Sequence, residues 1–488
     1  MADLVKQYEE LKAKCDGGAK KEVFVTGLKE LEQEARAAGA KAWALFFAAK
    51  VVEAQSEPGA AIQAHDKVIA LAAGTKDPAV LLPCAWSLVN KGCFLGLNGK
   101  HLEAVAVFDE VLSRFGDCTE TPFRVQVAKA LVNKGYAMGR AERPLGAIVA
   151  YDEVLRRFGE ATEPALREQV ACALASKAYA LGRAGKFLEA ITACDEVLKR
   201  FGDAKEPGLR EQAAWALVSK GYALGQVRTH LEEIAVYDEV VRQFGDAKEP
   251  ALREQVAKAC LNKGNALGRA DKPLEAVAAY DEAIRRFGDA KEPPLREQVA
   301  WALAYKVYAL GRAGKPLGAI TACDEVLRRF GDAKEPTLRE QVVTALFYKG
   351  HALGQAETHI EEIAVYDEVL RRFGDAAEPA VRELVARALF NKGHTLGDVG
   401  KQLEAIAAYD QLLRRFGDAT EPALWDWAAR ALFNKGYALT QAGKRVEAVA
   451  AYDEVVKRFG DATDPALRES VSRAVFYKRY ALGGEKAP

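Results

Sequence analysis

The sequence predicts an all-α fold, an α-solenoid superhelix of tandem helical hairpins. Three observations lead to this prediction: a Phe-Gly pair returns at a constant spacing of 43 residues, a proline follows most of these pairs at a fixed distance, and each unit holds two helical patterns. Sequence periods of about 20–50 residues indicate repeat arrays, in which each unit packs only against its neighbours. The phenylalanines of the pairs are Phe115, Phe158, Phe201, Phe244, Phe287, Phe330, Phe373, Phe416 and Phe459.

The repeats divide the chain into three parts. We expect residues 1–34 to form amino-terminal capping helices, residues 35–464 to form ten repeats of 43 residues, and residues 465–488 to supply a carboxyl-terminal capping helix. The first repeat is degenerate, and its first helix is expected over residues 40–55. Terminal helices with a polar outer face keep a solenoid from stacking end to end.

Each unit reads as a helical hairpin with recognisable ends. A proline such as Pro164 suits the first turn of the first helix, where its missing N–H needs no partner. The glycine after each repeating phenylalanine is expected to close the second helix in the left-handed conformation. Small residues recur on both helices, such as Gly135 on the first and Ala147 on the second. We expect them to lie opposite each other, so that the two helices approach closely.

Two charged positions repeat in every unit. A lysine recurs on the first helix, from Lys91 to Lys478, and an aspartate recurs on the second, from Asp66 to Asp453. We expect each lysine to pair with an aspartate while its aliphatic stem lies along the helix interface. The alternative is a lysine row that tracks phosphates, and the equal numbers of acidic and basic residues, 69 of each, argue against it.

Composition restricts the location and the partners of the chain. No secretory signal and no apolar run long enough to span a bilayer are evident, so we expect a cytoplasmic protein without a membrane partner. The eight cysteines show no paired spacing and read as buried, reduced thiols. Cys194 and Cys323 occupy a position that holds tyrosine in most other units, which indicates packing rather than chemistry.

The spacing within each unit resembles that of the tetratricopeptide repeat. A small residue at Gly135, a turn near residue 142, Ala147 and then Tyr151 follow the order of that family's 34-residue unit. The first helix here is longer by nine residues, a lysine replaces a large apolar residue, and Phe-Gly replaces the closing proline. The resemblance covers residues from about 35 to the end, with the turn glycines at Gly185, Gly314, Gly400 and Gly443.

This resemblance implies that the first helices line a concave groove, which in the family commonly binds an extended peptide or a partner helix. The variable positions of the first helices are therefore the candidate partner-binding residues. The carboxyl-terminal half combines aromatic anchors, cations and amide side chains there. The residues are Phe347, Phe390, Phe433, Phe476, Arg387, Arg430, Arg473, Asn391, Asn434, His351, His394 and Tyr437.

Each of these groups has a plainer interpretation. The phenylalanines could widen the apolar stripe beside Leu346, Leu389 and Leu432. The arginines could be a solvated face or partners of local glutamates, and the tyrosine and histidines could be ordinary rim residues. The family's variant that captures chaperone tails uses lysine and asparagine where this chain has apolar residues or tyrosine, so we do not predict such an adaptor.

No catalytic, metal-binding or cofactor-binding pattern is evident. The six histidines lack metal-ligand spacing, and neither a nucleophile motif nor a phosphate loop occurs. We expect a non-enzymatic scaffold, with a monomer favoured, that holds a protein or peptide partner in the concave groove. The alternatives are a helical-repeat protein that binds nucleic acid, which net neutrality makes unlikely, and a structural protein that assembles through its terminal helices.

Overall fold

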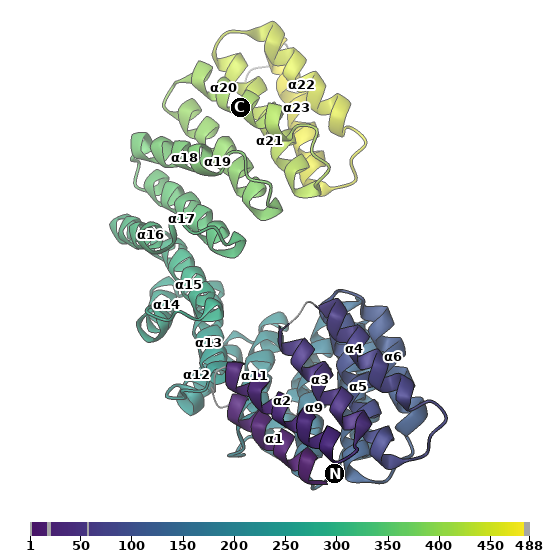
Figure 1. Ribbon diagram of the computed structural model, residues 1–488. Coiled ribbons are helices and arrows are strands. Elements are labelled where there is room, and N and C mark those ends of the chain that lie inside the picture. Colours follow the sequence, from purple (N-terminus) through teal and green to yellow (C-terminus); the bar gives the residue numbers. More distant parts are fainter. Residues whose placement is uncertain (1, 17–20, 56–57, 483–488) are drawn as a thin grey trace. The chain divides into compact units, whose positions relative to one another are not determined.

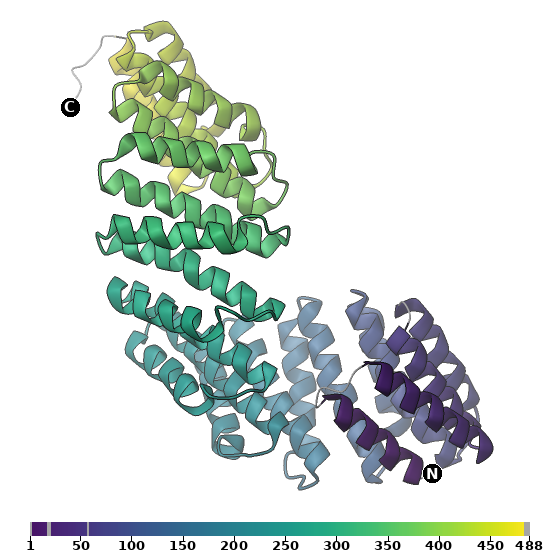
Figure 2. The same cartoon turned by 60° about the vertical axis from the view of Figure 1, so that its left-hand side comes forward.

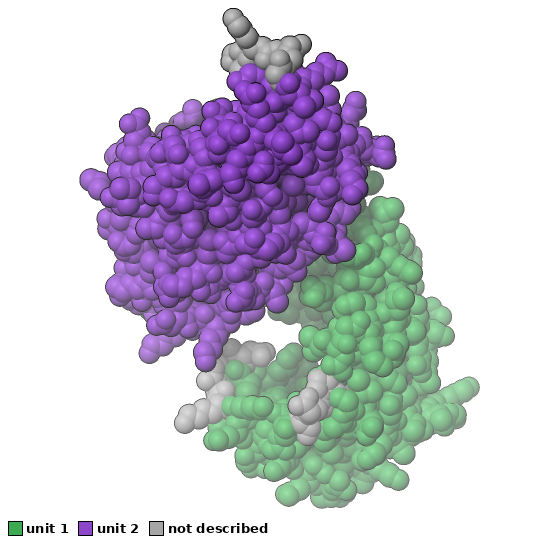
Figure 3. Space-filling model, turned by 90° about the horizontal axis from the view of Figure 1, so that it is seen from above, with its two compact units in different colours: residues 1–255 green, residues 256–488 purple. Residues whose placement is uncertain are grey.

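The computed structural model describes residues 2–16, 21–55 and 58–482, which form helices and connecting turns without any strand. This confirms the predicted all-α fold. Two compact units, residues 1–255 and 256–488, are distinguished (Figure 3). The boundary falls inside α13 (Pro250–Arg269). The first unit contains α1 (Ala2–Asp16), α2 (Lys21–Ala37), α3 (Lys41–Gln55), α4 (Pro58–Leu71), α5 (Pro78–Leu97), α6 (His101–Phe115), α7 (Thr121–Arg140), α8 (Pro144–Phe158), α9 (Pro164–Arg183), α10 (Phe187–Phe201), α11 (Pro207–Gln226) and α12 (His230–Phe244).

The second unit continues the alternation of a long first helix and a shorter second helix (Figure 1). Odd-numbered helices from α3 onward are first helices, and even-numbered ones are second helices. The unit contains α14 (Pro273–Phe287), α15 (Pro293–Arg312), α16 (Pro316–Phe330), α17 (Pro336–Gln355), α18 (His359–Phe373), α19 (Pro379–Asp398), α20 (Gln402–Phe416), α21 (Pro422–Gln441), α22 (Arg445–Phe459) and α23 (Pro465–Ala481).

Within each unit, the first helices form an inner layer. Successive first helices pack against one another, as α5, α7, α9 and α11 do in residues 1–255 and α15, α17, α19, α21 and α23 do in residues 256–488 (Figure 2). Among the described residues, successive second helices make no such contact. Because the first helices pack against one another and the second helices lie farther apart, each stack bends toward its first helices. The exposed faces of the first helices therefore line the concave side.

A glycine on the first helix receives an aromatic ring from the second helix of the same hairpin. A Cβ on Gly135 would lie 2.5 Å from Cε1 of Tyr151. The prediction that Gly135 lies opposite Ala147 was therefore wrong, because Ala147 faces Gly139 instead. The ring needs the space that the missing side chain leaves. The same contact recurs at Gly92–Phe108, Gly221–Tyr237, Gly264–Tyr280, Gly350–Tyr366, Gly393–Tyr409 and Gly436–Tyr452.

Two hairpins replace both partners of this contact together. Cys194 and Cys323 stand at the position of the ring, and both are fully buried. Ala178 and Val307 stand at the corresponding glycine positions, and they are buried as well. A smaller group on one helix thus accompanies a larger group on the other, which conserves the packed volume. Burial of Cys194 and Cys323 agrees with their interpretation as packing residues.

The other cysteines divide into two classes. Cys84 and Cys260 are buried, whereas Cys15, Cys93, Cys118 and Cys172 are only half-buried. The prediction of burial was therefore wrong for these four. No cysteine in the described residues forms a disulfide.

The helix ends agree with the sequence in one respect and differ in another. Pro164 opens α9 as expected. The glycine after the repeating phenylalanine is not left-handed, since Gly159 has φ −52° and ψ −36°. It is small because a Cβ there would lie 2.4 Å from the carbonyl oxygen of Leu155. The left-handed residue lies in the turn between the two helices, where Gly185 has φ 76° and Glu142 has φ 59°.

Successive hairpins are joined by repeated ion pairs. The lysine of each first helix contacts the aspartate of the preceding second helix, which confirms the predicted pairing. The lysine side chains are 17–34% exposed and the aspartates 33–59%, so each pair contributes at most about 1 kcal/mol. The pairs are Lys91–Asp66, Lys134–Asp109, Lys177–Asp152, Lys220–Asp195, Lys306–Asp281, Lys349–Asp324, Lys392–Asp367, Lys435–Asp410 and Lys478–Asp453.

Arginines add two further connections between neighbouring hairpins. Arg167 on one first helix pairs with Glu206 at 3.2 Å, and Glu206 is the residue that caps the next first helix. On the second helices, Nη1 of Arg329 donates to the carbonyl oxygen of Gly288, at the end of the preceding second helix, at 3.0 Å. Such bonds satisfy carbonyls that a helix end leaves unpaired.

One helix meets the length and composition of a membrane span, contrary to the expectation from the sequence. This helix is α5, and no other helix in the described residues does so. Within the stack, Cys84, Ala85 and Leu88 of α5 are buried, and α5 packs against α3, α4, α6 and α7. Its apolar character thus serves packing within the first unit.

We predict that Gly350→Ala destabilises the chain by about 1–3 kcal/mol, because the new Cβ would lie 2.6 Å from Cε1 of Tyr366. Adding Tyr366→Cys should recover part of this loss, since Ala178 and Cys194 form the same combination naturally. The double variant should be less destabilised than the sum of the two single variants by about 1 kcal/mol or more. Urea unfolding followed by circular dichroism measures this, with Gly182→Ala as the control, because a Cβ there meets no atom within 4 Å.

We predict that Glu325 makes the free energy of unfolding depend on pH in the acidic range. Hydrogen bonds from Arg328 and then from Arg329 lower the pKa of Glu325 to about 2. Because the folded pKa lies below the unfolded value, this stabilisation is complete above about pH 4.5 and is lost as the pH falls toward 2. Glu325→Gln should cost about 1 kcal/mol at pH 7 and nothing near pH 2. Thermal melts across this range measure the difference, and an equal loss at both pH values would contradict it.

Candidate functional site

The predicted partner-binding residues lie on α17, α19, α21 and α23, which are successive first helices of the unit 256–488. They therefore belong to the inner layer of one stack. The structure separates them into buried supporting residues and accessible ones. This division was not evident from the sequence.

Two of the four phenylalanines are part of the core. Phe347 and Phe433 are each 4% exposed, and Phe433 lies against Tyr452 of the neighbouring second helix with ring centroids 5.9 Å apart. For these two, the alternative interpretation as a wider apolar stripe is correct. Phe390 is half-buried and Phe476 is 41% exposed.

The three arginines lie over aromatic rings. The guanidinium carbon of Arg387 is 4.4 Å from the centroid of Phe347, and that of Arg473 is 4.4 Å from the centroid of Phe433. Arg430 lies 5.1 Å from the ring of Trp427 and forms an ion pair with Asp426 at 2.9 Å. Cation–π contacts of this kind are typical of arginine. Each of these three rings thus carries a guanidinium group.

The arginines differ in what they can offer a partner. Nε of Arg387 is buried without a hydrogen-bond acceptor among the described residues, and the residue as a whole is half-buried. Arg430 is neutralised by Asp426. Arg473 is exposed, and within residues 2–16, 21–55 and 58–482 no carboxylate pairs with it. Arg473 is therefore the cation with donors available to a ligand.

The two asparagines are engaged within the stack. Nδ2 of Asn391 donates to the hydroxyl of Tyr366 at 3.3 Å. Asn434 lies near the hydroxyl of Tyr409, whose pKa is raised by burial and lowered in part by this amide. Each amide can therefore hydrogen-bond to a peptide backbone only through the donors and acceptors that these internal contacts leave available. Only Asn434 lines a pocket.

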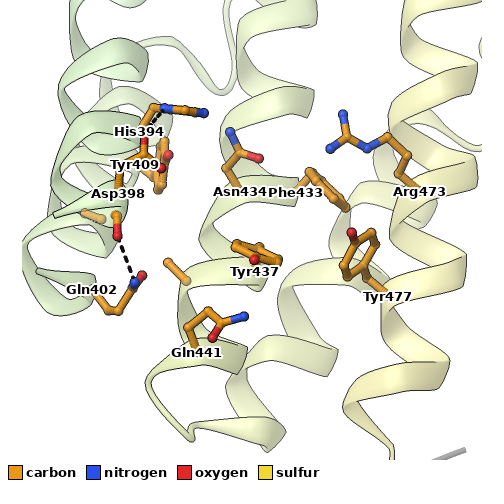
Figure 4. Close-up of a pocket in the computed structure, with 13 residues that line it drawn as sticks. His394, Asp398, Gln402, Tyr409, Phe433, Asn434, Tyr437, Gln441, Arg473 and Tyr477 are labelled. Atoms are coloured by element: carbon orange, nitrogen blue, oxygen red, sulfur yellow. Dashed lines mark hydrogen bonds and ion pairs between the residues drawn. The ribbon is translucent and has the colours of Figure 1, made fainter. Parts of the chain in front are cut away.

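The accessible residues gather around a pocket of about 440 Å³ between α19, α20, α21 and α23 (Figure 4). Its wall includes five of the predicted residues, namely His394, Phe433, Asn434, Tyr437 and Arg473. Figure 4 shows His394 and Arg473 on opposite sides, with Asn434 and Tyr437 between them. The pocket therefore offers two aromatic faces and separated polar groups.

The pocket also holds residues that the sequence analysis missed. These include Asp398, Gln402, Gln441 and Tyr477. Asp398 pairs with Nδ1 of His394 at 2.9 Å, and the ring of Tyr477 is 5.8 Å from that of Tyr437. A signal was present, because Asp398 replaces an arginine or a glutamine at the corresponding position of other units, such as Arg312 and Gln355.

A second pocket of about 340 Å³ shares His394, Phe433, Asn434 and Arg473 with the first and adds Phe390 and Arg430. Glu469 and Ser470 complete its wall. The two pockets form one continuous surface over α19, α21 and α23, which we call the carboxyl-terminal groove. Five predicted residues line neither pocket, namely Phe347, His351, Arg387, Asn391 and Phe476.

The groove carries little net charge. Arg430 and Arg473 are opposed by Asp398, Asp426 and Glu469. No cluster of histidine, cysteine and carboxylate side chains suited to a metal occurs in the described part of the chain. The arrangement is chemically suited to hold a polar segment with an aromatic or aliphatic side chain.

Comparison with known proteins identifies the repeat. Residues 390–463 match the model of the tetratricopeptide repeat family, and this segment includes Phe433, Asn434 and Tyr437. A tetratricopeptide repeat protein from Parabacteroides merdae ATCC 43184 is similar in structure, with 11% sequence identity and a TM-score of 0.38 over 62% of this chain and 98% of that one. No curated protein matches the sequence.

We predict that Phe433 and Phe476 differ in their contribution to stability although they occupy equivalent positions. Phe433→Ala should lower the free energy of unfolding by about 3–5 kcal/mol, because the ring is 4% exposed. Phe476→Ala should cost less than about 1 kcal/mol, because 41% of this residue is exposed. Chemical denaturation of the two variants measures the difference, and equal costs would show that the ring of Phe433 is not a core residue.

Proposed function

We propose that the chain, of which residues 390–463 match the tetratricopeptide repeat family, is a non-enzymatic scaffold that binds a protein or peptide partner in the carboxyl-terminal groove. Tetratricopeptide repeats generally mediate protein–protein interactions. The observation that carries the proposal is Arg473, an exposed cation that lies on the ring of Phe433 beside a pocket and has no carboxylate partner in the described residues.

The geometry of the groove favours a peptide or a helix over a small molecule. The two pockets are shallow continuations of one surface over three first helices, and they share four residues. The exposed ring of Tyr437, 42% accessible, provides apolar contact area at its centre. Arg473 and Asp398 provide opposite charges at its edges. An aromatic or aliphatic anchor flanked by polar contacts is the usual recognition mode on such surfaces.

Two observations favour this function over the alternatives. The lysine row that would contact phosphates in a nucleic-acid reader is paired with aspartates throughout the described units, so it is not available to a polyanion. Helix α23 carries Arg479 at the position where most other first helices have the glycine that receives a ring. A second helix of another copy cannot dock there in the same way. Neither a catalytic role nor a cofactor is part of the proposal, and a cytoplasmic location remains a prediction from the sequence.

We predict that Arg473→Glu abolishes capture of the partner from native lysate, because it reverses a cation of the carboxyl-terminal groove that no carboxylate in the described residues neutralises. Arg479→Glu is the matched control, since Arg479 lies on the same helix and lines neither pocket. Both variants should keep the melting temperature of the wild-type protein. Affinity capture with mass spectrometry should then show one protein recovered by the wild type and by Arg479→Glu but not by Arg473→Glu.

Equal recovery by all three proteins would exclude the carboxyl-terminal groove as the binding site. Recovery of nucleic acid in place of a protein, with binding that weakens steeply as salt rises, would favour the nucleic-acid alternative. The comparison of Arg473→Glu with Arg479→Glu is informative because each substitution changes the net charge by the same amount. A general electrostatic effect would therefore act on both variants.

A further inference from the structure

The amino-terminal helix α1 lies on the inner face of the first unit instead of extending the stack. Among helix pairs, its backbone packs only against α2. Its side chains nevertheless reach the first helices α3 and α5, where Tyr8 contacts Phe46, Phe47 and Trp86 with ring centroids 5.8, 5.9 and 5.4 Å apart. One helix thus lies across the concave side of residues 1–255.

The position that α1 covers is equivalent to the candidate site of the second unit. Trp86 and Lys129 stand at the position of the first helix that Arg387, Arg430 and Arg473 occupy further along the chain. Nζ of Lys129 lies 5.9 Å from the ring of Trp86. The same motif of a cation on a ring therefore occurs in both units. In the first unit a helix of the chain itself covers it.

α1 is an amphipathic helix with its apolar residues on one face. Leu4, Tyr8 and Leu11 follow the spacing i, i+4, i+7. Leu4 is 7% exposed and Tyr8 is 4% exposed, so both are held in the groove. Lys6 and Glu10, on the other side of the helix, are exposed and pair with each other. Helices that dock into hydrophobic grooves have this pattern.

Charged side chains of α1 also lie near the inner face of the first unit. Glu9 and Lys12 lie near Lys129, a half-buried cation of α7. Burial lowers the pKa of Lys129, Lys12 lowers it further, and Glu9 opposes both. The aromatic anchor of α1 therefore favours the docked position, whereas the like charges of Lys12 and Lys129 oppose it. A contact of this quality is suited to reversible docking.

We propose that α1 is a displaceable self-ligand, and that the inner face around Trp86 is a second binding site whose partner is an amphipathic helix with an aromatic anchor. The partner helix would place its aromatic side chain where Tyr8 lies, between Phe46, Phe47 and Trp86. The site then becomes accessible only when such a partner helix displaces α1. This site is separate from the carboxyl-terminal groove, and neither proposal depends on the other.

The test uses the full chain and a fluorescein-labelled synthetic peptide of residues 2–16 as the probe. In the wild-type protein, α1 occupies the groove and competes with the peptide. The full-length variant Leu4→Ala/Tyr8→Ala should release its own helix, and it should bind the peptide at least roughly tenfold more tightly than the wild type does. Fluorescence anisotropy measures both affinities.

Two controls define the contact. A peptide carrying Tyr8→Ala should bind the variant at least roughly tenfold more weakly than the unchanged peptide, because it lacks the anchor. Trp86→Ala, added to the variant, should abolish binding, whereas Tyr222→Ala should not. Tyr222 is exposed on a first helix of the same unit, and its ring contacts no aromatic ring of α1 within the described residues. Equal and weak binding of the peptide by the wild type and the variant would overturn the proposal.

Hydrogen exchange on the wild-type protein supplies an independent measurement should the variant fail to fold. The proposal expects the amides of α1 to exchange faster than those of α3, since α1 opens alone. Exchange of α1 and α3 at the same rate, only through global unfolding, would show that α1 is a permanent cap of the stack and would overturn the proposal.

Discussion

The close contact between a glycine on each first helix and an aromatic ring on its partner helix is the constraint on which the architecture depends. At Gly350 and Tyr366, the ring lies where a Cβ would be, so the two helices approach more closely than ordinary side chains allow. Because the contact repeats in nearly every hairpin, each hairpin has the same shape and presents the same surface to the next. Successive first helices then crowd together on one side of each stack.

The scaffold contacts recur with little change, whereas the inner face varies. The lysine–aspartate pairs between hairpins occur at every corresponding position with a described contact, as at Lys306–Asp281. By contrast, the inner position that holds Trp86 in one repeat holds Lys129, Cys172 or Arg473 in others. Uniform contacts preserve the geometry, and the variable residues can change without cost to it. This separation is what a binding scaffold requires.

The sequence predicted the repeats, the hairpins and the lysine–aspartate pairs, because these features follow from spacing alone. It failed where the rotation of a helix decides which side chains meet. Gly135 was assigned to Ala147, but its partner is Tyr151, since helix rotation decides which residues meet. Asn391 was taken as free for a ligand, although its Nδ2 donates to the hydroxyl of Tyr366 on the preceding hairpin at 3.3 Å. Phe433 and Phe476 look alike in sequence but differ in burial, since Tyr452 of α22 and Tyr477 of α23 lie against the ring of Phe433.

The central claim is that partners meet the inner face of the first helices and not the second helices. Site-specific photocrosslinking tests it most directly, with benzoylphenylalanine placed either at Tyr437 on α21 or at Leu403 on α20, which is 63% exposed. The account predicts that a bound protein crosslinks through position 437 and not through position 403. Crosslinks formed through position 403 alone would place the partner on the outer layer and contradict it.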